Sequence, residues 1–230
     1  MPKKTEVVLV CVAHRDDESL GCSGAIQNHL KKKDTVFCIS MTDGVSSRSK
    51  KILTKKKNKR VKDSIMASKI LGFKWIDIKK KFPDNKMDQI PLLEIVKVIE
   101  EVKRKIKPTI IYTHNPTDLN IDHRIVTDAV MTAFRPQAGE IWKKIIAFEI
   151  PSSTDYSYYK ENKSFIPNYI LNIEKFWNKK KRAIKSYGSE IKKYPNSRSI
   201  KGIYNLAKIR GVQNGIKLAE AFRILKEIQR

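Results

Sequence analysis

The feature that most constrains the fold is the apolar run EVVLVCVA at residues 6–13. Its β-branched residues follow one another without polar alternation, which predicts a strand buried on both faces of a parallel sheet. The next residues, HRDDE, place a histidine and three adjacent acids at the end of this strand. Because neighbouring carboxylates repel one another, this arrangement predicts a cation close to them.

Strands and helices alternate through the first half of the chain. We expect further strands at 35–42, 74–78 and 109–113, and helices at 20–33, 60–72 and 91–107. Such alternation is typical of an α/β fold with a mostly parallel sheet flanked by helices and joined by right-handed crossovers. Ligands of such sheets bind at the carboxyl ends of the strands.

The second half of the chain is less regular. Strands are expected at 145–150 and 167–173 and a helix at 174–193, while the tail at 205–225 begins as a helix and ends in LAEAFRIL, which fits either a helix or a strand. The sequence contains no internal repeat and no low-complexity linker. We therefore expect one domain over residues 1–230, with a core at 1–150 and a substrate-shaping C-terminal region at 151–230.

The chain carries 48 lysines and arginines against 24 acids, a formal net charge of +24. Its lysine runs are scattered, at 31–33, 54–60, 79–81 and 178–182. A nucleic-acid surface would gather basic residues on one face and interleave aromatic residues for stacking, so nucleic acid is not the expected partner. Two interpretations remain open: lysines that decorate solvent-exposed faces, or an acidic substrate or partner.

No segment approaches the length of about 20 apolar residues that a membrane-spanning helix needs, and the first residues lack the pattern of a secretory signal. Cys11, Cys22 and Cys38 show no CxxC spacing, so neither a disulfide framework nor a thiolate zinc site is expected. These features predict a cytoplasmic protein.

Three polar motifs are expected at one edge of the sheet: HRDDE after the first strand, TDGVSSR after the second and HNPTDLNIDHR after the fourth. Within them, His14, Asp17 and His123 provide two imidazoles and one carboxylate, the ligand set of an open catalytic zinc site. The alternative is that the acids cap the following helix and the histidines are solvated loop residues. His29 lies in the middle of a predicted helix and is expected to be structural.

These motifs resemble those of the PIG-L and LmbE-like family of N-deacetylases. AHRDDE is similar to the family signature AHPDDE, and THNPTDLNIDHR is similar to the second metal motif in the form found among bacterial members linked to sugar metabolism. Further similar segments are TDGVSSR, FPDNKMD, FEIPSSTDY, FIPNYI, YPNSRS and RGVQNGIKLAEAF. The resemblance therefore covers nearly the whole chain.

The resemblance implies a Rossmann-like fold and a hydrolase that removes the acetyl group from an N-acetylglucosamine-type sugar in a small glycoconjugate, releasing acetate and a free amine. It implies one divalent metal ion, usually zinc, held by His14, Asp17 and His123, with Asp16 as the general base. One aspartate must face the ion while its neighbour takes a proton from the attacking water. A competing hypothesis is a basic protein that binds nucleic acid or an anionic glycan and whose metal site is structural or absent.

Two positions depart from the family pattern. Asn120 stands where many relatives carry a histidine, so two donors to the oxyanion are considered. The ring of His114 is preferred because it can be protonated, and the amide of Asn120 is the alternative. Asp122, beside His123 in the same motif, is counted with the catalytic group. Arg15 replaces the proline of the signature and adds a cation able to meet an acidic substrate.

The resemblance also implies contacts to the sugar hydroxyls from Arg48, Asp84 and Asn85, in loops at the ligand-binding edge of the sheet. Arg198, in NSRSI, is a further candidate. For each of these residues the alternative is an exposed loop side chain. The expected partner is an N-acetylated amino sugar, and the basic charge of the chain is compatible with an acidic one. Because relatives often associate, a homo-oligomer is also expected.

Overall fold

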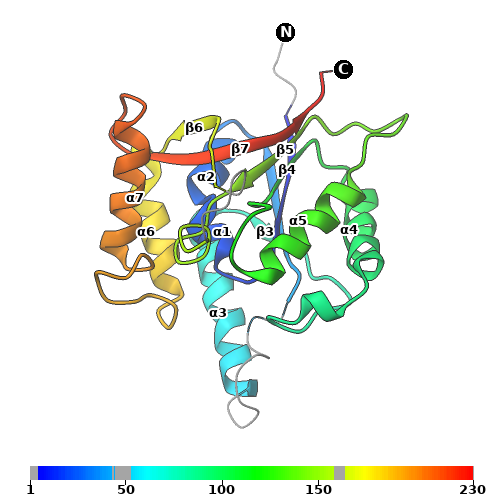
Figure 1. Ribbon diagram of the computed structural model, residues 1–230, viewed down its shortest axis with the longest axis horizontal. Helices are drawn as coiled ribbons and strands as arrows, with labels where there is room; N and C mark the ends of the chain where they lie inside the picture. The colour runs from blue at the N-terminus through cyan, green and yellow to red at the C-terminus, as the bar shows by residue number, and fades with distance from the viewer. Residues whose placement is uncertain (1–4, 43, 45–52, 158–163, 230) are drawn as a thin grey trace.

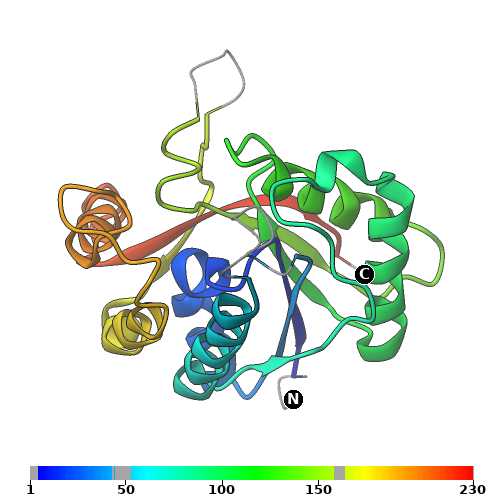
Figure 2. The ribbon, with the colours of Figure 1, turned by 90° about the horizontal axis from the view of Figure 1, so that it is seen from below.

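The computed structural model describes residues 5–42, 44, 53–157 and 164–229. Within these ranges, seven strands form one sheet in the order β3-β2-β1-β4-β5-β7-β6, and helices pack on both of its faces (Figure 1; Figure 2). The strands are β1 (Val7–Val12), β2 (Thr35–Ser40), β3 (Lys74–Trp75), β4 (Ile110–His114), β5 (Lys144–Phe148), β6 (Tyr169–Asn172) and β7 (Ala219–Glu227).

The sheet is mostly parallel, as the alternation of strands and helices predicts. β1 pairs in parallel with β2 and β4. β2 also pairs in parallel with β3, and β4 with β5. β7 is antiparallel to both of its neighbours, β5 and β6. Because β1 and β4 are neighbours that run in the same direction, the loops that follow them meet at one edge of the sheet.

The segment LAEAFRIL, for which a helix and a strand were both possible, belongs to a strand. Phe222 of β7 pairs with Phe148 of β5 on one side and with Tyr169 of β6 on the other. The first four residues of β7 are buried, whereas its last two are exposed. Pairing with two strands from elsewhere in the chain therefore decides the conformation where local propensity does not.

Helices cover both faces of the sheet. In Figure 2, α4 and α5 lie on one face, while α2, α3 and α6 lie on the other. The helices are α1 (Asp17–Gly21), α2 (Ser23–Lys31), α3 (Leu53–Leu71), α4 (Leu92–Ile106), α5 (Ile121–Ala133), α6 (Trp177–Ser186) and α7 (Ile200–Val212), with short 3-10 turns η2 (Met87–Gln89) and η3 (Glu174–Phe176).

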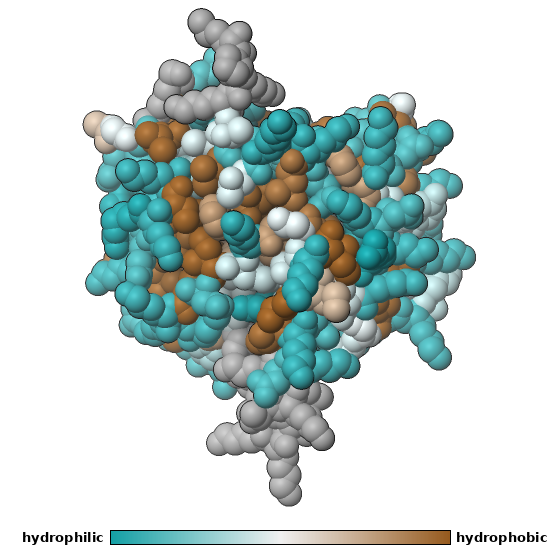
Figure 3. Space-filling view, turned by 180° about the vertical axis from the view of Figure 1, so that it is seen from behind, coloured by the Kyte–Doolittle hydropathy of each residue, from teal (hydrophilic) through white to brown (hydrophobic). Residues whose placement is uncertain are grey.

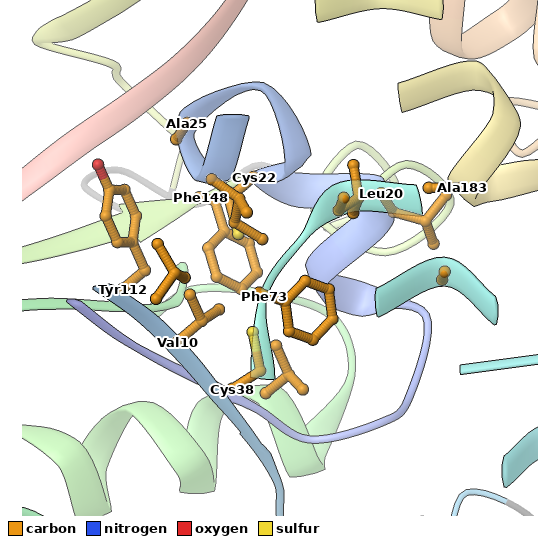
Figure 4. Packing of buried hydrophobic residues seen from close by; sticks show 14 of the residues in the cluster. Val10, Leu20, Cys22, Ala25, Cys38, Phe73, Tyr112, Phe148 and Ala183 are labelled. Atoms are coloured by element: carbon orange, nitrogen blue, oxygen red, sulfur yellow. The ribbon is translucent and has the colours of Figure 1, made fainter. Parts of the chain in front are cut away.

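The first strand is buried on both faces, as its composition predicts. Val8, Val10 and Val12 belong to a core shared with α2, α3 and α6, whereas Leu9 and Cys11 belong to a second core shared with α4 and α5. Figure 4 shows the first core, where strand side chains pack against residues of α1, α2 and α6. On the face seen from behind, hydrophilic residues surround an apolar area (Figure 3).

Several elements differ from their predicted bounds. The helix expected at 20–33 begins at Asp17 and divides at Cys22 into α1 and α2. The strand expected at 74–78 is the two-residue edge strand β3, and the helix expected at 174–193 begins with η3 and ends at Ser186. Helix α5 is not predicted, although Val126, Val130 and Ala133 give it a buried stripe.

The C-terminal strand is joined to the start of α2 by a buried carboxylate. Glu220 of β7 accepts hydrogen bonds from the backbone N–H groups of Gly24 and Ala25 at 2.8 and 2.9 Å. Lys180 of α6 donates to the same carboxylate at 2.7 Å and to the carbonyl oxygen of Leu20 at 2.8 Å. A Cβ atom at Gly24 would overlap Ile173 and Glu220, which explains the small residue at this position.

The remaining expectations concern cysteines, His29 and the membrane. Cys11, Cys22 and Cys38 are free and buried. His29 is buried between Asp34 and the hydroxyl of Tyr112, as expected for a structural histidine. Among the described residues, no helix is both long enough and apolar enough to cross a membrane.

Candidate metal centre and active site

His14, Asp17 and His123 converge at the carboxyl ends of β1 and β4. The Nδ1 atom of His14 lies 3.4 Å from Oδ2 of Asp17 and 3.3 Å from Nε2 of His123, and that Nε2 atom lies 3.5 Å from the same Asp17 oxygen. Ligands at about 2.0–2.1 Å from a tetrahedral zinc ion are themselves about 3.4 Å apart. The three donor atoms therefore have the spacing that such an ion requires.

Asp17 is fully buried, and within the described chain its Oδ1 atom has no hydrogen-bond partner. Burial opposes ionisation of this carboxyl, but the surrounding imidazoles of His123, His114 and His14 outweigh that effect and lower its pKa. Asp17 is thus an ionised carboxylate in a dry environment, which is the state that a cation requires of its ligand.

Carboxylates also lie behind both imidazoles. The Nε2 atom of His14 is 3.1 Å from Oδ2 of Asp122 and 3.0 Å from Oδ1 of Asp84. The Nδ1 atom of His123 is 3.2 Å from Oδ1 of Asp118. Each ring therefore turns one nitrogen to a carboxylate and the other towards Asp17, as metal-binding histidines commonly do.

The carboxylates around His14 favour its charged form. Burial disfavours the imidazolium, but contacts with the carboxylates of Asp122, Asp17 and Asp84 outweigh that effect and raise its pKa well above the ordinary value. A cation near these acids would replace the proton, since a ligating imidazole must be neutral.

Asp16, the neighbour of Asp17, faces a different group of residues. Its Oδ2 atom lies 3.0 Å from Nη1 of Arg60 and 3.4 Å from Nη1 of Arg198. Burial raises the pKa of Asp16, and the two guanidinium groups oppose that effect without cancelling it. The backbone of Asp16 has a φ angle of 148°, a strained value for a residue with a Cβ, and its N–H donates to Glu18 at 3.1 Å.

Glu18, the third acid, has a structural environment. Its Oε1 atom accepts hydrogen bonds from Ser19 Oγ at 2.7 Å and from Tyr187 Oη at 2.8 Å. Burial raises the pKa of Glu18 to about 7. The three adjacent acids therefore occupy three separate environments: a candidate metal ligand, a pocket carboxylate and a buried hydrogen-bond acceptor.

A pocket of about 220 Å³ opens beside His14 and Asp16. Among the described residues, its lining offers hydrogen-bond donors and acceptors and no aliphatic side chain, a composition that suits a ligand rich in hydroxyl groups. The lining residues are His14, Asp16, Gly44, Arg60, Asp84, Asn85, Asn120, Glu190 and Arg198.

The two candidate oxyanion donors have different surroundings. His114 is fully buried and stacks on His123 at 3.9 Å between ring centroids, and its Nε2 atom accepts the N–H of Ala13 at 2.9 Å. Burial and the neighbouring His123 lower the pKa of His114 well below its ordinary value. Asn120 caps α5 through its Oδ1 atom, lines the pocket and directs its amide nitrogen towards Asn85, 3.5 Å away.

Arg15 lies outside the pocket, contrary to its expected contact with substrate. Its guanidinium donates to Ser64 Oγ at 2.7 Å and to Asp77 at 3.2 Å, and it stacks over Trp75 at 4.8 Å. The side chain thus packs against α3 and β3, while only its neighbours in sequence face the pocket. Arg48, the other arginine expected to bind sugar, lies outside the described residues.

The sequence motifs do not single out Arg60, Glu190 or Asp118. Arg60 ends the basic run at 54–60, for which solvent-exposed faces and an acidic partner are both possible, yet it is only 6% exposed and pairs with Glu190 at 2.6 Å. No local signal distinguishes it from the lysines before it. For Asp118 the signal was available, because this acid lies within the second histidine motif.

Fold and site together define an α/β protein with a two-histidine, one-aspartate centre beside a polar pocket. Residues 9–134 match the model of the PIG-L family, described as GlcNAc-PI de-N-acetylase. The chain belongs to this family. Among curated proteins the comparison finds no match.

Three solved structures illustrate the shared fold. GalB, the 4-carboxy-2-hydroxymuconate hydratase from Pseudomonas putida, is 20% identical, with 98% of each chain covered and a TM-score of 0.77. The N,N'-diacetylchitobiose deacetylase from Pyrococcus horikoshii is 19% identical over 96% of this chain and 84% of the other, with a TM-score of 0.75. A conserved protein from Thermus thermophilus is 19% identical over 98% of this chain and 97% of the other, with a TM-score of 0.73.

Proposed function

We propose that this protein is a metal-dependent N-deacetylase that removes the acetyl group from an N-acetylglucosamine-type sugar in a small glycoconjugate. The observation that carries the proposal is the triangle of His14, Asp17 and His123 beside the pocket carboxylate Asp16. Membership of the family whose model is described as a de-N-acetylase supports this chemistry, and the fold shared with a diacetylchitobiose deacetylase agrees with it. The products are acetate and a free amine.

His14, Asp17 and His123 would hold one divalent ion, for which zinc is our proposal. A mixed nitrogen and oxygen donor set with tetrahedral spacing suits zinc, and only three protein ligands leave a position for water or substrate. When bound, such an ion supplies Lewis-acid activation of the amide carbonyl and of the attacking water.

Asp16 acts as the general base in this proposal. It takes a proton from the attacking water and returns it to the departing amine nitrogen, so that the carbon–nitrogen bond breaks with a neutral amine as leaving group. Arg60 and Arg198 hold its carboxylate at the pocket wall. Asp122 contributes by orienting His14 through the contact with Nε2 and needs no proton transfer of its own.

For the oxyanion donor we favour Asn120 over His114, which reverses the preference drawn from the sequence. The Nε2 atom of His114 already accepts the N–H of Ala13, and the ring is buried beneath His123, whereas the amide of Asn120 lines the pocket. Asp84, Asn85 and Arg198 are candidates for contacts with the substrate from the same lining. Arg48 stays a prediction from the resemblance.

The test is acetate release by purified protein with a panel of N-acetylated amino sugars and their conjugates, neutral and acidic. The protein is first stripped of metal with a chelator and then reloaded with zinc or another divalent ion. We expect equal amounts of acetate and free amine, only after reloading, and turnover lower by about 10²- to 10⁴-fold in Asp16→Asn. Activity without metal, or no acetate from any member of the panel, would contradict the proposal.

Product analysis also separates this reaction from two others. A hydratase shares the fold, so addition of water to an unsaturated acid is assayed alongside, because a fold does not by itself imply a function. A basic binding protein would show affinity for polyanions that falls by several decades between low and moderate salt, without any product.

A further inference from the structure

Asp118 is a buried carboxylate placed behind His123. It lies in the loop between β4 and α5 and is only 1% exposed. Its Oδ1 atom is 3.2 Å from Nδ1 of His123, whose Nε2 atom faces His14 and Asp17. A carboxylate at this position touches a candidate ligand without itself being one of the three donors.

Hydrogen bonds fix the carboxylate of Asp118 from both sides. The hydroxyl of Ser153 donates to Oδ1, and the hydroxyl of Thr154 donates to Oδ2 at 2.6 Å. The backbone N–H of Asn120 donates to Oδ1 at 2.9 Å. Ser153 and Thr154 follow β5, so two separate segments of the chain prevent this carboxylate from rotating.

We propose that Asp118 is a positioning residue that sets the tautomer and the orientation of His123. A neutral imidazole has one N–H and one lone pair, and a carboxylate at Nδ1 selects the tautomer with the proton there. The lone pair of Nε2 then points to Asp17 and His14. This inference rests on the proposed function, since it requires these residues to bind a metal ion.

The competing explanation is that Asp118 only stabilises the fold by connecting the β4–α5 loop to the turn after β5. Both explanations predict that loss of the carboxylate is harmful. They differ in metal affinity: a positioning role lowers affinity for the ion even in a variant whose metal-free form is as stable as the wild type.

The experiment measures zinc and cobalt affinity by competition with a chromophoric chelator, together with the unfolding temperature of each metal-free variant. We expect Asp118→Asn to bind metal about 10- to 100-fold more weakly, the usual effect of losing a partner of a ligating histidine. Thr154→Val alone should weaken metal binding less than Asp118→Asn does. Added to Asp118→Asn, it should weaken metal binding no further, because the Thr154 hydroxyl acts through the Asp118 carboxylate. Asp128→Asn, on the exposed side of α5, is the matched control and should bind as the wild type does.

The outcomes separate this inference from the proposed function. If the wild type binds no divalent ion, the proposed function fails. The role of Asp118 then fails as well, because it requires a bound ion. If the wild type binds metal and Asp118→Asn binds it equally well, the proposed function stands and the positioning role is wrong. Should Asp118→Asn not fold, Thr154→Val decides: weaker metal binding at an unchanged unfolding temperature supports the role, and unchanged binding overturns it.

Discussion

The carboxylate of Asp16 lies 3.0 Å from the guanidinium of Arg60, a residue of α3. The same arginine donates to the carbonyl oxygen of Arg15 at 2.9 Å and pairs with Glu190 at 2.6 Å. Arg60 therefore joins the loop after β1 to the segment after α6, and it does so at the wall of the pocket. Arg60 is the more buried of the two arginines that contact these acids, since Arg198 lies 3.4 Å from Asp16 and 3.8 Å from Glu190.

Replacing Arg60 should destabilise the whole protein. Arg60→Met leaves Asp16 and Glu190 buried with less compensation, and removal of one partner from a buried ion pair costs about 3–5 kcal/mol. Denaturant unfolding measures the loss of free energy. Arg104→Met, on an exposed position of α4, is the control and should change stability little. A loss below about 1 kcal/mol for Arg60→Met would show that Arg198 or water, rather than Arg60, compensates the acids.

Stability should fall in acid because of His29. Its Nδ1 atom lies 2.8 Å from Asp34 and its Nε2 atom lies 3.0 Å from the Tyr112 hydroxyl, so the neutral ring satisfies both partners. Burial lowers the pKa of His29, and Asp34 offsets this only in part.

The sign of this effect follows from the direction of the shift. As pH falls through about 6.5, the unfolded chain takes up a proton before the folded one does, so stability present above that pH is lost below it. The measurement is the free energy of unfolding at pH 8 and pH 5 for wild type and His29→Gln. We expect the free energy of unfolding to fall more in the wild type than in His29→Gln between pH 8 and pH 5. An equal fall in both would show that His29 is not the group responsible.

Asn120 should matter for turnover and not for metal binding. If its amide stabilises the oxyanion, Asn120→Ala lowers kcat by about 10²- to 10³-fold, the usual effect of losing one such donor. The variant should retain the metal content of the wild type. Asn120→Asp, which still caps α5 but cannot donate, is the matched control for folding and should be equally impaired. If His114→Gln is impaired and Asn120→Ala is not, the donor is His114.

The ligand triangle predicts the stoichiometry of metal binding. Wild type should bind one zinc ion per chain, and His123→Ala should lose it after gentle dialysis because only two ligands remain. His29→Ala, remote from the triangle, controls for the general loss of a histidine. Elemental analysis of dialysed protein gives the answer directly, and full metal content in His123→Ala would refute the ligand set.

The sequence predicts that His14, Asp17 and His123 lie together, because they stand next to strand ends. The β-branched run that forms β1 and the two histidine motifs are local, and neighbouring parallel strands bring their ends together without further information. Arg15 shows the limit: its position beside His14 does not determine the direction of its side chain, which Ser64 and Asp77 set from other elements. Arg60 shows the converse, since tertiary contacts alone distinguish it from a run of lysines. LAEAFRIL became a strand for the same reason.

The adjacent aspartates allow the most direct test of the proposed mechanism. Asp17 belongs to the ligand triangle, whereas Asp16 lines the pocket between Arg60 and Arg198. Asp17→Asn should weaken metal binding, because an amide is a poorer ligand than a carboxylate. Asp16→Asn should retain the metal and the fold and lose about 10²- to 10⁴-fold in turnover, the usual contribution of a general base.

Metal content and kcat of the two variants, measured side by side, distinguish the possibilities. Loss of metal from Asp16→Asn with retention in Asp17→Asn would reverse the two roles. If both variants keep metal and activity, the acids only cap α1 and the centre lies elsewhere. Asp63→Asn, on α3, carries the same change of charge away from the pocket lining and controls for it. Opposite phenotypes would follow from the contacts of the two carboxylates, since Asp16 meets Arg60 and Arg198 whereas Asp17 meets the histidines.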